Sequence, residues 1–256
     1  MRPTQLFLPC MSGLLCLLGS TASAGPPLLS DDPNTVEPRH LELISAVTAS
    51  ERGADAFLQV TAIDAAYGLL PRLELDFTLD VVASDHEKDD DGRFEHSAVP
   101  LTVAFKWEPL RSEHFSLAVA PGLSFEVDDP DRVSGNIPLL VEARAKGVRV
   151  GATGSYLPSD ESRSGWVASI YGGWIAIPEV ELLGEVYAGA FASRGDPELA
   201  FNLGMDLTLA PRLHLLASGG SGFYGGSGSR REFSAYLGLQ LLLGPFLDAP
   251  GREPSP

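Results

Sequence analysis

Apolar and polar residues alternate strictly along residues 73–81 of this chain. Every odd position from Leu73 to Val81 is apolar, and every even position is polar or acidic. A β-strand places two such sets on opposite faces, whereas a helix would scatter both around its axis. The same period of two returns in residues 101–107, 201–209 and 233–243, and weaker versions cover the rest of residues 40–243. The pattern predicts an all-β chain.

The expected strands are long and even in number. We expect twelve, most of them with 9–13 residues, whereas ordinary globular strands have about 5–6 residues and membrane-spanning strands need about 9–11. This favours an antiparallel transmembrane β-barrel over a soluble periplasmic β-sandwich, in which alternation also occurs. The expected strands are residues 40–49, 55–66, 72–83, 97–107, 114–126, 137–146, 148–157, 165–176, 179–192, 198–209, 212–220 and 231–243.

Two kinds of connection alternate between these strands. The short ones contain proline, whose ring presets the turn dihedral: residues 69–75 and 209–215 share the form L-x-P-R-L-x-L, and residues 177–182 are a looser copy. The longer, more polar ones are residues 84–96, 127–136, 158–164, 193–197 and 221–230. Short periplasmic turns and longer extracellular loops are the usual polarity of an outer-membrane barrel.

Charged residues fall on one face of the expected strands, and we place that face inward. An Arg or Lys on the lipid-facing side at mid-depth costs about 2–4 kcal/mol. Acidic residues concentrate on the third and ninth strands and basic ones on the fourth to seventh, so the two sets either pair across a narrow interior or set a field across a pore. The inward residues are Glu42, Glu74, Asp76, Asp80, Glu142, Glu181, Glu185, Asp206, Lys106, Arg144, Lys146, Arg149 and His214.

Seven of these inward residues are the expected lining of a solute path. Their role would be electrostatic selection, without chemistry on the solute. They are Glu74, Asp76, Lys106, Arg144, Arg149, Glu185 and Asp206.

Aromatic residues gather near the ends of the expected strands. Amphipathic rings favour the boundary between membrane and water, which predicts aromatic girdles, and ordinary core packing is the alternative. The residues are Tyr67, Trp107, Phe115, Phe125, Tyr156, Trp166, Trp174, Phe191, Phe223 and Phe233.

Residues 1–24 have the form of a secretory signal peptide. Arg2 supplies the positive start, residues 14–18 are rich in leucine, and residues 22–24 form an A-x-A cleavage site. The apolar stretch is far shorter than the ~20 residues that span a membrane. Cys10 and Cys16 both lie in this segment, so we expect no disulfide in the mature chain. Export of a barrel predicts the outer membrane of a Gram-negative bacterium.

The rest of the chain divides into three parts. Residues 25–39 form an N-terminal periplasmic segment or a partial plug, residues 40–246 the barrel, and residues 247–256 a disordered, Pro-rich tail. In the plug alternative, Asp31 and Asp32 meet lumen bases such as Arg144 or Arg149. In the other alternative, residues 25–38 are an exposed linker into the first strand.

Composition and motifs exclude several classes of function. The net charge is -16, and nucleic-acid binding needs a basic face, so we expect no nucleic-acid partner. Residues 87–98 approach a calcium loop, but Ala98 stands where a bidentate Glu is needed. Residues 220–225 fit G-x-G-x-x-G, yet no helix is expected after them to hold a pyrophosphate. We expect no metal and no cofactor.

The sequence also lacks the common motifs of hydrolytic enzymes. The sequence has no G-x-S-x-G elbow and no H-E-x-x-H zinc spacing. We therefore expect no enzyme and no catalytic residue. An outer-membrane lipid hydrolase built on one of the histidines is the less favoured alternative.

The start of the mature chain resembles a bacterial family. It reads G-P-P-x-x-x-D-D-P-x-T over residues 25–35 and E-x-x-H-x-E over residues 37–42. With residues 62–75, this resembles the MetA-pathway of phenol degradation family, specifically over about residues 25–82. The resemblance implies a transporter-like outer-membrane barrel that passes small aromatic or hydrophobic compounds, and it assigns no site residues. The chain departs from the usual aromatic end of such barrels, because Gly244-Pro245-Phe246 and the tail follow the last strand.

These observations predict an outer-membrane channel or transporter for small molecules, aromatic or hydrophobic ones among them. A structural or adhesive barrel without transport is the alternative. The expected partners are outer-membrane lipid and lipopolysaccharide, the solute, and the barrel-assembly machinery.

Overall fold

The computed structural model describes residues 27–52, 55–84, 95–127, 129, 133–158, 164–191, 198–224 and 230–245. The expected signal peptide, residues 87–94 of the calcium-like segment, and the tail lie outside the described residues. The strands are β1 (Leu41–Arg52), β2 (Asp55–Leu70), β3 (Leu73–Ser84), β4 (Glu95–Ala98), β5 (Pro100–Arg111), β6 (Phe115–Val119), β7 (Gly122–Glu126), β8 (Val133–Ala145), β9 (Val148–Leu157), β10 (Gly165–Ile177), β11 (Val180–Phe191), β12 (Glu198–Ala210), β13 (Leu213–Tyr224) and β14 (Arg230–Leu243).

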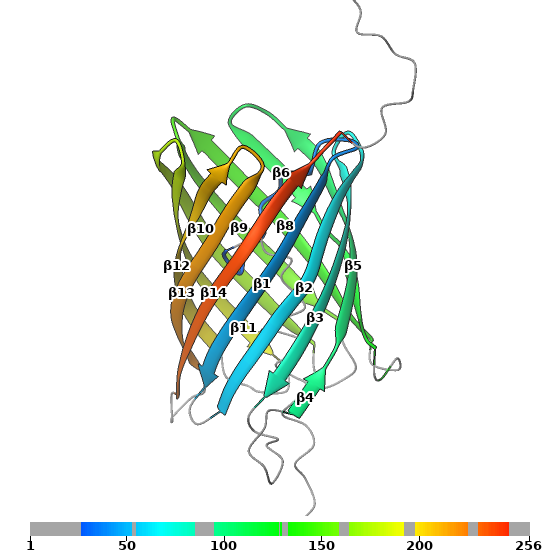
Figure 1. Cartoon of the computed structure of the whole chain (residues 1–256), viewed down its shortest axis with the longest axis vertical. Coiled ribbons are helices and arrows are strands. Elements are labelled where there is room, and N and C mark those ends of the chain that lie inside the picture. Colours follow the sequence, from blue (N-terminus) through cyan, green and yellow to red (C-terminus); the bar gives the residue numbers. More distant parts are fainter. Residues whose placement is uncertain are drawn as a thin grey trace, which may run out of the picture.

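These segments form one closed antiparallel barrel (Figure 1). The first strand pairs with the last along its whole length, from Leu41 opposite Leu243 to Arg52 opposite Glu232, and this pairing closes the sheet. β4 and β5 are one barrel strand interrupted at Val99, and β6 and β7 are another interrupted at residues 120–121. The barrel therefore has 12 strands, and the predicted all-β fold is confirmed.

Four two-residue turns between described strands lie at one end of the barrel, and the connections at the other end are longer, apart from residues 53–54 between β1 and β2. Residues 71–72, 146–147, 178–179 and 211–212 each join two strands at what we call the turn end. Lys146 and Gly147 have φ values of 48° and 76°, as a type I′ hairpin requires. The prediction that Lys146 points inward is wrong, because β8 ends at Ala145 and Lys146 is an exposed turn residue.

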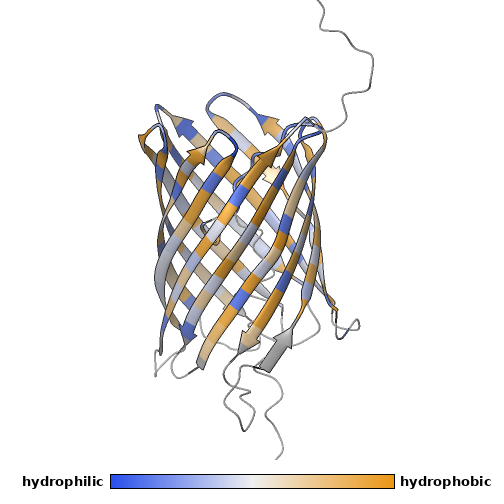
Figure 2. Cartoon of the chain, viewed as in Figure 1, coloured by the Kyte–Doolittle hydropathy of each residue, from blue (hydrophilic) through white to orange (hydrophobic). Residues whose placement is uncertain are grey.

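The outer surface of the barrel is apolar. Figure 2 shows hydrophobic positions recurring along the strands, and on β12 the side chain of Leu203 is 67% exposed, whereas that of Asn202 is 6% exposed. Trp107, next to the turn end, and Trp166, near the opposite end, are also more than half exposed. Among the described residues, no helix is long and apolar enough to cross a membrane.

Several strands run further than their sequence pattern predicts. β1 continues to Arg52, β2 to Leu70, β5 to Arg111 and β13 to Tyr224, and β8 begins at Val133. In β5 the register with β6 shifts between Trp107 and Leu110, around Pro109, which lacks an amide proton. The burial of Lys106 and Glu108 keeps the period of two across this point, so Glu108 was missed because the expected strand ended at Trp107.

Candidate functional site: a closed solute pathway

Residues 27–38, here called the N-terminal segment, lie inside the barrel (blue in Figure 1). At its start, the amide of Leu29 donates to Glu185 Oε2 at 2.7 Å, and Ser30 hydrogen-bonds both Glu185 and the Ser169 hydroxyl. Glu185 is on β11 and Ser169 on β10. From there the segment crosses the interior toward β3 and β5 and enters β1 at the turn end.

Asp31 contributes to a buried cluster of charges on the far wall. Lys106 Nζ lies 2.8 Å from Asp31 Oδ2 and 3.1 Å from Glu74 Oε1. Glu74 also accepts a hydrogen bond from the amide of Val36, and Asp76 hydrogen-bonds Glu74. The ammonium group of Lys106 thus interacts with three carboxyl groups, those of Asp31, Glu74 and Asp76. Burial raises the pKa of Asp31 to about 8, because the cost of desolvating the carboxylate outweighs the attraction of Lys106.

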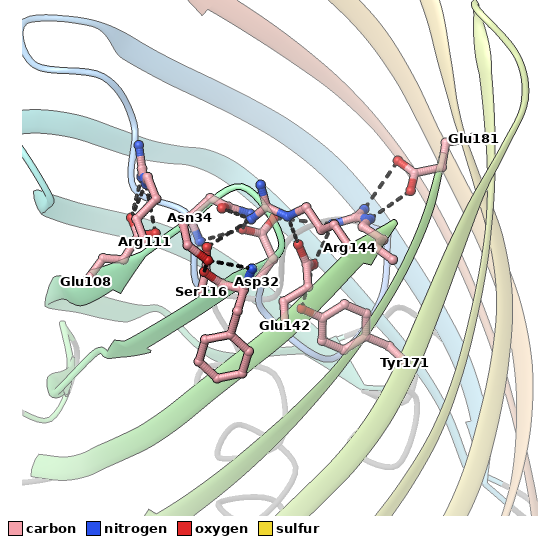
Figure 3. Close-up of polar contacts among 12 residues, drawn as sticks. Asp32, Asn34, Glu108, Arg111, Ser116, Glu142, Arg144, Tyr171 and Glu181 are labelled. Carbon is pink, nitrogen blue, oxygen red and sulfur yellow. Dashed lines mark hydrogen bonds and ion pairs between the residues drawn. The ribbon is translucent and has the colours of Figure 1, made fainter. Parts of the chain in front are cut away.

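Arg149 on β9 holds the next residue of the segment and links it to two wall strands. Its partners Asp32, Glu142 and Glu181 are labelled in Figure 3. Its Nη1 lies 3.5 Å from Asp32 Oδ2 and 3.3 Å from Glu142 Oε2 on β8. Its Nε lies 2.7 Å from Glu181 Oε1 on β11. The Tyr171 hydroxyl donates to Glu142 Oε2 at 2.9 Å. Burying a charge is costly unless it is paired, so each charge of this network depends on its partners.

Two further arginines bind the segment between Asp32 and the turn end (Figure 3). Arg144 pairs with Glu142 and donates to the side-chain oxygen of Asn34. Arg111 pairs with the fully buried Glu108 and donates to the carbonyl oxygen of Thr35 at 3.1 Å. Arginine and lysine side chains of the wall therefore anchor residues 31–35 of the N-terminal segment.

Gly68 fixes the point where the segment leaves the interior. Pro38 forms an isolated parallel bridge with Gly68, and the Arg39 amide donates to the Gly68 carbonyl oxygen at 2.7 Å. A Cβ atom on Gly68 would lie 2.1 Å from the Glu37 carbonyl oxygen. Only glycine permits this approach of the two backbones.

A cavity of about 260 Å³ lies beyond the segment, toward the longer connections. Leu28, Leu29 and Asp31 of the segment form part of its lining. Wall residues from mid-depth to the end opposite the turns, such as Thr48 and Tyr187, form the rest. The interior is thus divided into a chamber and a turn end filled by the segment and its ion pairs.

The seven residues predicted to line a path are placed as follows. Glu74, Lys106, Arg144 and Arg149 contact the N-terminal segment at the turn end. Asp76 and Glu185 line the chamber. Asp206 lies apart from these contacts and pairs with His214, Oδ1 to Nδ1, at 2.8 Å.

Of the two plug contacts named from the sequence, Asp32 meets Arg149, whereas Asp31 meets Lys106. Glu108 and Tyr171 were missed as polar residues of the interior. Glu108 lies in the strand extension beyond Trp107. Tyr171 has the inward parity of Ser169, opposite to that of Trp166 and Trp174, but the inward residues were chosen by charge.

His214 bears on the hydrolase alternative. Its contacts with Asp206 and with the Thr208 hydroxyl, the latter at 3.5 Å, both use Nδ1. Neither contact presents a hydroxyl group to Nε2, where a histidine oriented by an acid would act as a base. In the part of the chain that the structure describes, no group of three or more His, Cys, Asp or Glu is arranged to hold a metal ion.

The sequence matches no family model and no curated protein, so the resemblance to the MetA-pathway family stays a resemblance. Several solved structures share the fold. The COG4313 outer membrane channel from Pseudomonas putida F1 is 11% identical, with a TM-score of 0.57 over 82% of this chain and 97% of that chain. The NanC porin is 8% identical, with a TM-score of 0.55 over 78% and 98%. The CymD monoaromatic hydrocarbon channel is 10% identical, with a TM-score of 0.52 over 82% and 89%. The chain has the fold of outer-membrane channels.

Proposed function

We propose that this protein is an outer-membrane channel for small solutes and that the N-terminal segment closes its turn end. One observation carries the proposal. A segment outside the barrel strands lies within the lumen, held by ionic and hydrogen-bonding contacts, and leaves a chamber beyond it. Shared fold with proteins described as channels and porins supports the same function.

The membrane part of the proposal rests on the outer surface. Large side chains such as Ile170 and Leu203 are 65% and 67% exposed at mid-depth, and acyl chains would cover them. Trp107 and Trp174 near the turn end, and Trp166 near the other, would lie at the two boundaries with water. The turn end would face the periplasm and the longer connections the exterior, beside lipopolysaccharide. Insertion would require the barrel-assembly machinery.

Opening would depend on releasing the segment. Its removal would expose Lys106, Arg144 and Arg149, each beside its acidic wall partner Glu74, Glu142 or Glu181, along the path. A solute would then pass between rows of both signs, so its charge and size would decide its rate. This gives the predicted residues an electrostatic role, and we propose no catalytic one.

Liposome swelling tests the proposal. Vesicles containing the mature protein, or a variant lacking residues 25–38, are mixed with phenol or with a larger sugar. If the protein is a channel closed by the N-terminal segment, we expect vesicles with the deletion variant to swell faster in phenol than vesicles with the intact protein. A variant lacking residues 247–256 serves as the matched control and should behave as the intact protein.

A structural barrel without transport is the second candidate. The ion pairs that fill the turn end favour it, because they also fix the barrel wall. If the deletion variant is folded and inserted but its vesicles stay impermeable to phenol, the protein is a structural barrel and the channel proposal is wrong.

A further inference from the structure

We infer that the chamber binds small organic cations, meaning an ammonium group on a compact apolar body. This inference rests on the proposed channel function and names its class of solute. It comes from three features of the chamber, namely the sign of its charges, the state of two of its carboxylates, and the side chains beside them.

Every charged residue in the described lining of the chamber is acidic. Lysine, arginine and histidine are missing from that lining, because the described bases of the interior lie at the turn end with the N-terminal segment. A low-dielectric chamber lined in this way attracts cations and repels anions. The acidic residues are Asp31, Asp64, Asp76, Asp80, Glu185 and Glu232.

Asp64 and Asp80 are two lining carboxyl groups that the described wall holds by hydrogen bonds and not by ion pairs. Asp64 accepts a hydrogen bond from the Thr78 hydroxyl at 2.9 Å, and Asp80 accepts one from the Thr61 hydroxyl at 2.7 Å. Neither forms an ion pair within the described ranges of the chain, in contrast to Asp31 with Lys106. The two residues lie on the neighbouring strands β2 and β3, a short diagonal apart. A cation bound between Asp64 and Asp80 would be attracted by both carboxylates.

An aromatic ring and an apolar wall stand beside this pair. Tyr236 on β14 packs on Ile44, Ala46 and Leu216, and its hydroxyl group is close enough to Asp64 and Asp80 to interact electrostatically with both. The Tyr236 ring lies over Gly238, where a Cβ atom would be 2.6 Å from the phenol oxygen. An aromatic face attracts an ammonium group, and the aliphatic wall suits the body that carries it.

The size of the chamber limits the ligand further. Its volume of about 260 Å³ is just below the ≈ 300–1,000 Å³ of pockets that hold drug-sized molecules. A single aromatic or aliphatic ring with one amine fits this description. A bare metal ion does not fit the chamber, because no metal-ligand cluster occurs among the described residues and much of the lining is apolar.

Calorimetry on the full mature protein in detergent tests the inference with three ligands of one shape. Benzylammonium, benzyl alcohol and benzoate carry positive, zero and negative charge. We expect benzylammonium to bind at least about tenfold more tightly than benzyl alcohol, which corresponds to about 1.4 kcal/mol, and benzoate to bind more weakly than both. Equal affinities, or tighter binding of benzoate, would overturn the inference without any variant.

Variants then locate the site. The double change Asp64→Asn and Asp80→Asn should bring benzylammonium to within about threefold of benzyl alcohol, because the charge preference is removed. Tyr236→Leu should weaken benzylammonium binding and Tyr236→Phe should preserve it, since the ring is kept. Glu179→Gln, at an exposed tight turn, is the matched control. An unchanged charge preference in the folded double variant would place the site elsewhere and contradict the assignment.

Binding and permeation separate the two proposals. Charge-selective binding by a barrel that never passes solutes, even without residues 25–38, would refute the channel and leave the cation site standing. A permeable deletion variant without charge-selective binding would refute the cation site alone.

Discussion

The ammonium group of Lys106, in the middle of the β5 wall, lies 2.8 Å from the carboxylate of Asp31 in the N-terminal segment. Both side chains are almost fully buried, and Glu74 completes the cluster. A charge in this setting depends on its partner, because removing one member strands the others away from water. The pair therefore joins the stability of the barrel to the position of the segment.

Lys106→Met should release the N-terminal segment. Asp31 and Glu74 would lose their shared cation, at a cost of about 3–5 kcal/mol for a broken buried pair. We expect a higher conductance in planar bilayers and a lower unfolding midpoint. Lys146→Met is the control, because Lys146 is exposed in a turn, and it should change neither. Equal behaviour of the two variants would show that the Lys106 pair does not hold the segment.

Gly68→Ala should displace the segment where it leaves the barrel. The new Cβ atom would overlap the Glu37 carbonyl oxygen, which it would approach to 2.1 Å. We expect faster proteinase K cleavage within residues 27–38 of the folded protein in detergent. Gly154→Ala is matched to it, because a Cβ there meets nothing within 4 Å. Protection as strong as in the unchanged protein would argue against the observed path of the segment.

Binding of the N-terminal segment should weaken as the pH rises. In the bound segment the pKa of Asp31 is raised from 3.8 to about 8, so between these values binding takes up a proton that release gives back. Stabilisation from this group is therefore present at low pH and is lost as the pH approaches 8. The charged groups that face Asp31 are Lys106, Asp32, Glu74 and Asp76.

We expect conductance to increase between pH 6 and about 8, and Asp31→Asn to flatten this increase. A decrease with pH, or the same slope in the variant, would show that another group controls the segment.

Leu203→Arg should destabilise the barrel in lipid by about 2–4 kcal/mol, the cost of an arginine at the midplane. Leu203 is 67% exposed on the outer face of β12. Leu209→Arg, on the same face next to the turn at residues 211–212, should cost only about 0–1 kcal/mol near the boundary with water. Unfolding by denaturant in vesicles measures both. Equal costs at the two depths would contradict a membrane around this surface.

Alternation predicted the fold because a barrel wall has two faces along its whole length. At residues 73–81 and 233–243 the alternation is strict, so the two-residue period of a strand is enough to predict which side chains share a face. Lys146 was misplaced because it continues the even-numbered run of charged residues, Glu142 and Arg144, into the turn. Glu108 was missed because the expected strand ended at Trp107, although Glu108 keeps the inward period of Lys106.

The candidate site was harder to predict than the wall. The sequence suggested that Asp31 and Asp32 would meet lumen bases, but the choice among Lys106, Arg144 and Arg149 depends on the register of β5, β8 and β9 and on the route of the segment. The chamber was harder still to predict from the sequence. Asp64 of β2 comes close to Tyr236 of β14 only when the pairing of β1 with β14 closes the barrel.

Single-channel conductance in planar bilayers tests the central claim most directly, by comparing the mature protein with a variant lacking residues 25–38. A lumen occupied by the N-terminal segment predicts a small or rarely open conductance for the mature protein and a larger, steadier one for the variant. Identical conductances from two folded, inserted proteins would contradict the claim that this segment closes the barrel.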